Sequence, residues 1–113
     1  MKKNYLIFVE HILDSLKNIE LFMKNVKKEN FFKDKEKQSA VIRQIEIMGE
    51  ATKNLPVSFR KQYSQISWKK ITGARDKLIH HYFGVDLDTI WDIVKEDLLI
   101  LKVQIEKILE QKD

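Results

Sequence analysis

The sequence predicts an all-α protein, an antiparallel four-helix bundle with one additional short helix. Two observations support this class. The 113 residues include only three glycines and one proline, too few turn formers for a multi-stranded β fold. Apolar residues also recur at helical spacing along several long stretches of the chain. Because this length suits one domain and not two, we expect a single domain over residues 1–113.

The first helix is expected over residues 3–26. Its apolar positions are spaced alternately by four and three residues, as in a helix packed in a bundle. They are Tyr5, Val9, Ile12, Leu16, Ile19, Met23 and Val26. The charged segment 27–37 that follows has no such period, so we expect a loop in which Phe31 and Phe32 fold back on the core.

The second helix is expected to begin at Asp34 or Lys35, with Asp34 as its N-cap, and to end near Pro56. Its buried stripe has the same spacing: Val41, Ile45, Met48, Thr52 and Leu55. Residues 57–66 are expected to form the additional short helix, which directs Phe59 and Tyr63 inward.

Ser67 is the predicted N-cap of the third long helix, which Gly84 would end. The predicted buried residues are Trp68, Ile71, Ala74 and Leu78. Gly73 lies inside this helix at a cost of roughly 1 kcal/mol relative to alanine, and such a glycine often admits a close backbone. Asp88 is predicted to cap the final helix, whose stripe is Trp91, Val94, Leu98, Leu101, Ile105 and Ile108.

The composition excludes several classes of protein. The chain has no cysteine, so disulfides and cysteine-based metal or redox chemistry are excluded and a cytoplasmic location is expected. Charged residues interrupt the apolar run near the N-terminus, which we therefore do not interpret as a signal peptide. No stretch approaches the ~18 apolar residues of a membrane span, so no membrane partner is expected. A net charge of +4 permits an anionic partner such as nucleic acid, but lysine-rich proteins often carry such charge only for solubility.

The segment GARDKLIHHYFGVD, residues 73–86, concentrates scarce residue types. Arg75 offers a fixed fork of donors suited to a phosphate, and His80 can give or take a proton near neutral pH. Together these groups suffice for attack of an RNA 2′-hydroxyl on its adjacent phosphate without a metal. Neither a metal nor another cofactor is expected, because the adjacent His80 and His81 point to different helix faces and no third ligand has useful spacing.

The spacing of these residues leaves alternatives open. On an ideal helix Arg75 and Tyr82 share a face, whereas His80 lies about 140° from Arg75. Either the helix loosens before Gly84, or a second subunit brings its own copy of the motif. A structural explanation is also available, and on spacing alone it is the stronger one. Histidines in the last helical turn favour the helix dipole, and Tyr82 could simply close the end of the bundle.

Arg75, His80 and Tyr82 form an R-x4-H-x-Y pattern that resembles the motif of the HepT toxin family, in the HEPN superfamily of helical RNases. Two longer segments resemble the same family: RQIEIMGEATKNLP at 43–56 and ISWKKITGARDKLIHHYFGVDLDTIW at 66–91. The resemblance covers essentially the whole chain and the order of its helices. It implies a HEPN-like fold.

The resemblance also implies a function. The protein would be a metal-independent endoribonuclease toxin of a type VII-like toxin–antitoxin system, cutting a transfer or messenger RNA through a 2′,3′-cyclic phosphate. Arg75 would stabilise the phosphate, His80 would transfer the proton, and Asp76 would orient Arg75 or a substrate hydroxyl. Two subunits would face their motifs across a homodimer interface. An MntA-like nucleotidyltransferase antitoxin would transfer AMP to Tyr82, and the motif gives His81 no role.

Two other hypotheses stand beside this one. The chain could be a catalytically silent helical partner that brings a nucleotidyltransferase to its substrate, or a purely structural helical dimer. The intact set of Arg75, His80 and Tyr82 favours the ribonuclease. A motif buried inside one subunit, away from any cleft, would favour the structural dimer.

Overall fold

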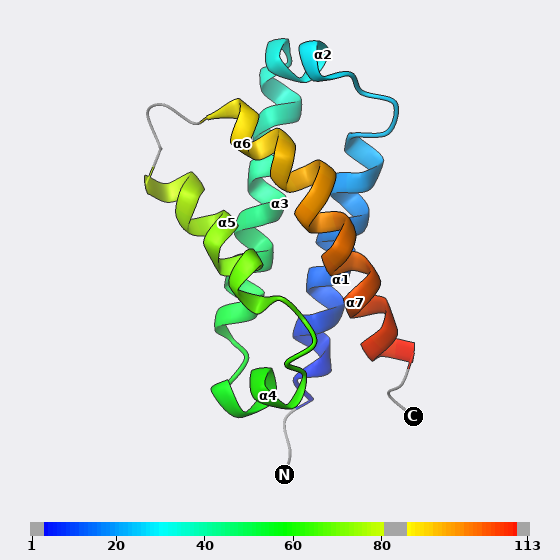
Figure 1. Ribbon diagram of the computed structural model, residues 1–113, viewed down its shortest axis with the longest axis vertical. Coiled ribbons are helices and arrows are strands. Elements are labelled where there is room, and N and C mark those ends of the chain that lie inside the picture. Colours follow the sequence, from blue (N-terminus) through cyan, green and yellow to red (C-terminus); the bar gives the residue numbers. More distant parts are fainter. Residues whose placement is uncertain (1–3, 81–85, 111–113) are drawn as a thin grey trace.

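The computed structural model describes residues 4–80 and 86–110, and this part of the chain is helical without any strand. The all-α prediction is therefore confirmed. The long helices are α1 (Leu6–Phe22), α3 (Lys35–Lys53) and α5 (Trp68–His80). A fourth rod joins α6 (Leu87–Asp92), the π-helical turn η1 (Ile93–Asp97) and α7 (Leu98–Glu110). Neighbouring rods along the chain run in opposite directions (Figure 1).

The predicted apolar stripes form one shared core. Every predicted position of α3 is buried, including the polar Thr52, whose hydroxyl donates to the Met48 carbonyl at 2.9 Å. The predicted buried positions of α5 are confirmed, as are those of the last rod except Trp91, which is partly exposed. On α1, Tyr5 and the downstream Val26 pack only partly against this core. Helix α3 lies between α1 and α5 and packs against both, so it links the core to the motif-bearing helix.

The segment between α1 and α3 differs from its prediction. α1 ends at Phe22, and Asn25 has a left-handed φ of 60°, which stops the helix from continuing to residue 26. The expected loop contains a short helix, α2 (Lys28–Lys33). Phe31 is fully buried as expected, and the centroids of its ring and the Trp91 ring are 5.9 Å apart. This packing stabilises α2, which is too short to show a repeating apolar spacing in the sequence.

The second predicted helix begins and ends close to its expected positions, and the third begins close to its own. Asp34 caps α3 by accepting from the Lys37 N–H at 3.0 Å. The additional short helix, α4 (Val57–Gln62), ends before the predicted residue 66, and the rings of Phe59 and Tyr63 pack together 4.7 Å apart at the edge of the core. α5 begins directly after Ser67, while Gly84, its predicted end, lies outside the described residues.

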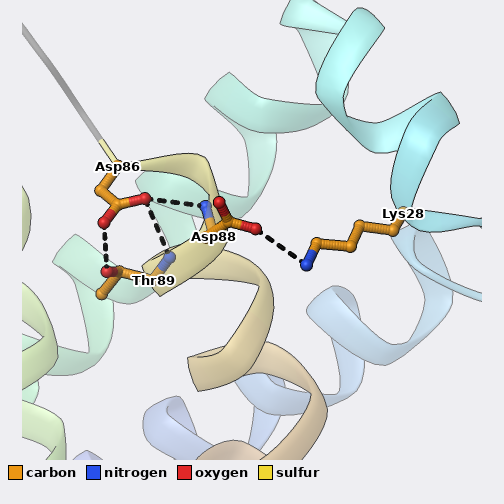
Figure 2. A network of polar contacts seen from close by, with 4 residues as sticks. All are labelled: Lys28, Asp86, Asp88 and Thr89. Carbon is orange, nitrogen blue, oxygen red and sulfur yellow. Dashed lines mark hydrogen bonds and ion pairs between the residues drawn. The ribbon is translucent and has the colours of Figure 1, made fainter.

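The N-cap of the last rod is Asp86, so the prediction of Asp88 is wrong. The Asp86 carboxylate accepts from the N–H groups of Asp88 and Thr89 at 3.0 and 3.4 Å and from the Thr89 hydroxyl at 2.9 Å (Figure 2). An N-cap side chain serves the second and third helical N–H groups, which places the cap two residues before Asp88. Asp88 instead pairs with Lys28 of α2 at 2.8 Å, and this hydrogen bond raises the pKa of Lys28.

The π-helical turn alters the buried stripe of the last rod. It adds a residue to one turn, so Ile93 and Val94 are both buried between Ile90 and Leu98. Across the described ranges, no helix is both long enough and apolar enough to cross a bilayer.

Candidate functional site

Arg75 extends from α5 along the surface of α3, and Gly49 makes this position possible. A Cβ atom built on Gly49 would overlap the Arg75 Cδ and lie 3.1 Å from both its Cβ and its Cγ. The apolar stem of Arg75 therefore fills the volume that any other residue at position 49 would occupy. The Arg75 side chain is only 19% exposed as a result, so its position is defined by packing as well as by charge.

Glu50, the next residue of α3, holds the polar end of Arg75. The Arg75 Nη2 donates to the Glu50 Oε1 at 3.1 Å, and the Glu50 side chain is 61% exposed. A pair open to water contributes only about 0.2–1 kcal/mol to stability. The pair thus orients the guanidinium more than it stabilises the fold, and a phosphate could take the place of the carboxylate. Arginine has five N–H donors, and Glu50 is the one hydrogen-bond partner of this side chain within the described residues.

His80 lies on the same helix as Arg75, and α5 remains α-helical up to and including His80. The two positions are therefore about 140° apart around the helix axis. The alternative that the helix loosens before Gly84 stays a prediction, because residues 81–85 lie outside the described residues. Tyr82 and His81 lie outside the described residues.

Asp76 is exposed on α5 beside Arg75. In the described part of the chain it makes no hydrogen bond or ion pair with Arg75, and Glu50 fills that position instead. Asp76 remains a candidate for its other predicted role, orienting a substrate hydroxyl.

The connection that contains Tyr82 runs between two anchored helices. Before it, α5 packs against α3, and its residues Ala74 and Leu78 are both buried. After it, the Asp86 cap fixes the first turn of α6, and the ion pair between Asp88 and Lys28 ties that turn to α2 (Figure 2). Where side chains are described, no three His, Asp or Glu residues lie close enough together to share a metal ion.

Sequence reasoning gave no role to Gly49 or Glu50, although both lie in a segment that resembles the HepT family. The available signal was a glycine inside a predicted helix, which costs roughly 1 kcal/mol unless packing requires it. That argument was applied to Gly73, where an added Cβ would meet no atom of the described residues within 4 Å. The close approach in this part of the chain is at Gly49.

Comparison with known proteins places this chain in a family. The Ribonuclease HepT-like family matches residues 12–108. A Thermococcus cleftensis protein named as a probable ribonuclease HepT is 44% identical over 108 residues, which cover 96% of this chain and 98% of that protein. A Methanocaldococcus jannaschii protein, whose name joins a gamma-glutamylcyclotransferase to a candidate RNase, is 49% identical over the whole chain, which spans 51% of its length. No solved structure gave a significant match. The match over most of the chain and the two aligned relatives show that the chain belongs to the Ribonuclease HepT-like family.

Proposed function

We propose that this chain is a metal-independent endoribonuclease, acting as one domain, in which Arg75 and His80 are the catalytic residues. The observation that carries the proposal is the position of Arg75. Its guanidinium is held at the surface of α3 by the space above Gly49 and by one hydrogen bond to Glu50. A half-buried guanidinium with free donors is suited to stabilise charge on a phosphate. The names of the relatives, which include a probable ribonuclease HepT, support the same activity.

The proposed reaction is a transesterification within the RNA chain. His80 takes the proton of a 2′-hydroxyl, and the 2′-oxygen forms a bond to the adjacent phosphorus. The bond from phosphorus to the 5′-oxygen breaks, and that oxygen leaves with a proton from a second imidazolium. The products are a 2′,3′-cyclic phosphate and a 5′-hydroxyl. Arg75 stabilises the charge that develops on the non-bridging oxygens.

The site is proposed to be composite, with two protomers facing each other. The positions of Arg75 and His80 on the regular α5 are about 140° apart around the helix axis, which favours a site shared by two protomers. A two-fold axis near α5 would bring two arginines and two histidines around one cleft. Those two histidines would supply the base and the acid that the reaction needs.

Control of the activity is proposed to act on Tyr82. An MntA-like nucleotidyltransferase would transfer AMP from ATP to the phenol oxygen, which loses its proton as pyrophosphate leaves. This chain would then be the toxin and the nucleotidyltransferase its antitoxin. The added phosphate brings negative charge and bulk to the cleft, which repels the RNA phosphate. The phosphate of the AMP group also competes with the RNA phosphate for the Arg75 guanidinium.

The test is cleavage of single-stranded RNA by purified Arg75→Ala and His80→Ala variants. Loss of His80 should slow cleavage by roughly 10²–10⁴-fold, and loss of Arg75 by roughly 10²–10³-fold. Arg43→Ala is the matched control, because Arg43 is an exposed arginine of α3 outside the motif. Its rate should equal that of the wild type, and a chelator should leave all rates unchanged. Wild-type cleavage by both motif variants, or loss of cleavage in EDTA, would disprove the mechanism.

A further inference from the structure

The net positive charge of this protein comes from one segment. Residues 51–75 contain six lysines and arginines and no acidic residue, a local charge of +6. The rest of the chain has 15 cationic and 17 acidic residues, a charge of −2, and the two parts give the total of +4. The whole excess thus belongs to the segment that leads up to Arg75. Charge added only for solubility has no reason to be collected in this way.

The fold gathers four of these six cations around one pocket of about 590 Å³, between α4 and the start of α5. We call it the basic pocket and define it by six of its polar residues: Arg60, Lys61, Ser64, Ser67, Lys69 and Lys70. Among the described residues, no carboxylate lines it. Two hydrogen bonds connect the walls of the pocket. The Trp68 Nε1 donates to the carbonyls of Arg60 and Tyr63, each at 3.1 Å, and so links the start of α5 to α4 and the residue that follows it.

Most of the charge in the basic pocket is uncompensated. Lys70 pairs with Asp97 at 3.2 Å, whereas Arg60, Lys61 and Lys69 have no carboxylate partner within the described ranges. The Arg60 Nε is buried there without a hydrogen-bond partner. Elsewhere the fold supplies partners, as for Lys28 with Asp88 and Lys102 with Glu20. Like charges placed together raise the energy of the free protein and favour binding of an anion.

We propose that the basic pocket binds backbone phosphates of a single RNA strand, next to the phosphodiester that Arg75 receives. This inference rests on the proposed function. Lys69 precedes Arg75 by six residues on α5, about 9 Å along the helix axis and about 120° around it. An RNA strand that passes partly around α5 covers this separation with a few nucleotides. Lysines and serine hydroxyls bind phosphates without identifying bases. Trp68 is buried, with its N–H already used, so it offers no stacking platform, and the pocket should accept any base sequence.

The experiment compares two double variants with equal loss of charge. Lys61→Gln/Lys69→Gln removes two exposed cations from the basic pocket. Lys17→Gln/Lys24→Gln removes two exposed lysines that line a separate groove between α1 and α7. The probe is a labelled 2′-O-methyl RNA of mixed sequence, which lacks the attacking hydroxyl and stays intact. Its affinity is measured over a salt series, and thermal unfolding confirms that both variants are folded.

The pocket variant should bind the probe more weakly. The slope of its log affinity against log salt should be smaller in magnitude by about 1.4, because each of the two lost phosphate contacts contributes about 0.7. On cleavable RNA its KM should rise while kcat at saturation stays near the wild-type value. The control variant should match the wild type. Equal salt slopes for the two variants would overturn the proposal, as would binding of an acidic protein in place of RNA.

Failure of this proposal can be told from failure of the proposed function. Wild-type protein that cleaves RNA, with a pocket variant of unchanged KM and salt slope, would overturn the basic pocket alone. Wild-type protein that binds the probe through the pocket but never cleaves unmodified RNA would support the basic pocket and disprove the ribonuclease.

Discussion

Replacement of Gly49 by alanine tests whether the space above α3 sets the position of Arg75. The new methyl group would overlap the Arg75 Cδ and press on the Cβ and Cγ from 3.1 Å. The helix backbone of α3 is fixed by the core, since Met48 and Ala51 are both buried. Arg75 must therefore move, and its guanidinium leaves the position beside Glu50.

The expected change in stability is small. Overpacking costs about 1–3 kcal/mol, and the better helix propensity of alanine returns about 1 kcal/mol. The net loss is then about 0–2 kcal/mol, and each 1 kcal/mol lowers the Tm of a domain of this size by roughly 4–8 °C. Activity should suffer more, because a misplacement of about 1 Å in a catalytic group costs about 10²-fold.

The assay measures thermal unfolding and the rate of RNA cleavage on the same preparations. Gly73→Ala is the matched control for stability, since its methyl group meets nothing within 4 Å in the protomer and should stabilise the folded chain by about 1 kcal/mol. The Gly49→Ala variant should be folded at the assay temperature and yet cleave about 10²-fold more slowly. A folded Gly49→Ala variant with the wild-type rate would refute the idea that Gly49 positions Arg75.

Two further predictions concern assembly and control. Light scattering should give at least twice the chain mass of 13.5 kDa. A mixture of Arg75→Ala and His80→Ala proteins should recover only part of the activity that each has lost, because a mixed dimer keeps one arginine for the phosphate and one histidine for one of the two proton transfers. A monomer at micromolar concentration would contradict a composite site. Tyr82→Phe should keep ribonuclease activity but gain no AMP mass when co-expressed with a cognate nucleotidyltransferase, whereas Tyr63→Phe should still be modified. AMP on the Tyr82→Phe protein, or equal cleavage by modified and unmodified wild type, would disprove the control mechanism.

The sequence alone determined the helical class and most of the core. Apolar spacing in α3, α5 and α7 identified buried positions correctly. A helix in a bundle buries one continuous stripe, so its apolar residues must recur every three or four positions along the sequence. Asp34 was identified as a cap for a similar reason, since its contact with the Lys37 N–H is local. The motif residues Arg75, His80 and Tyr82 were also found from sequence, through their scarcity and their resemblance to a family.

Tertiary structure decided the features that depend on distant partners. α2 is held by the packing of Phe31 near Trp91. A helix this short is not long enough to show a repeating spacing of apolar residues in the sequence. The sequence predicted Asp88 as the cap of the last rod, whereas the structure has Asp86 in that role and pairs Asp88 with Lys28, sixty residues earlier. The setting of Arg75 is the clearest case. Gly49 and Glu50 lie 26 and 25 residues before it in the sequence, and only the packing of α3 against α5 shows that one makes room for its stem and the other holds its charge.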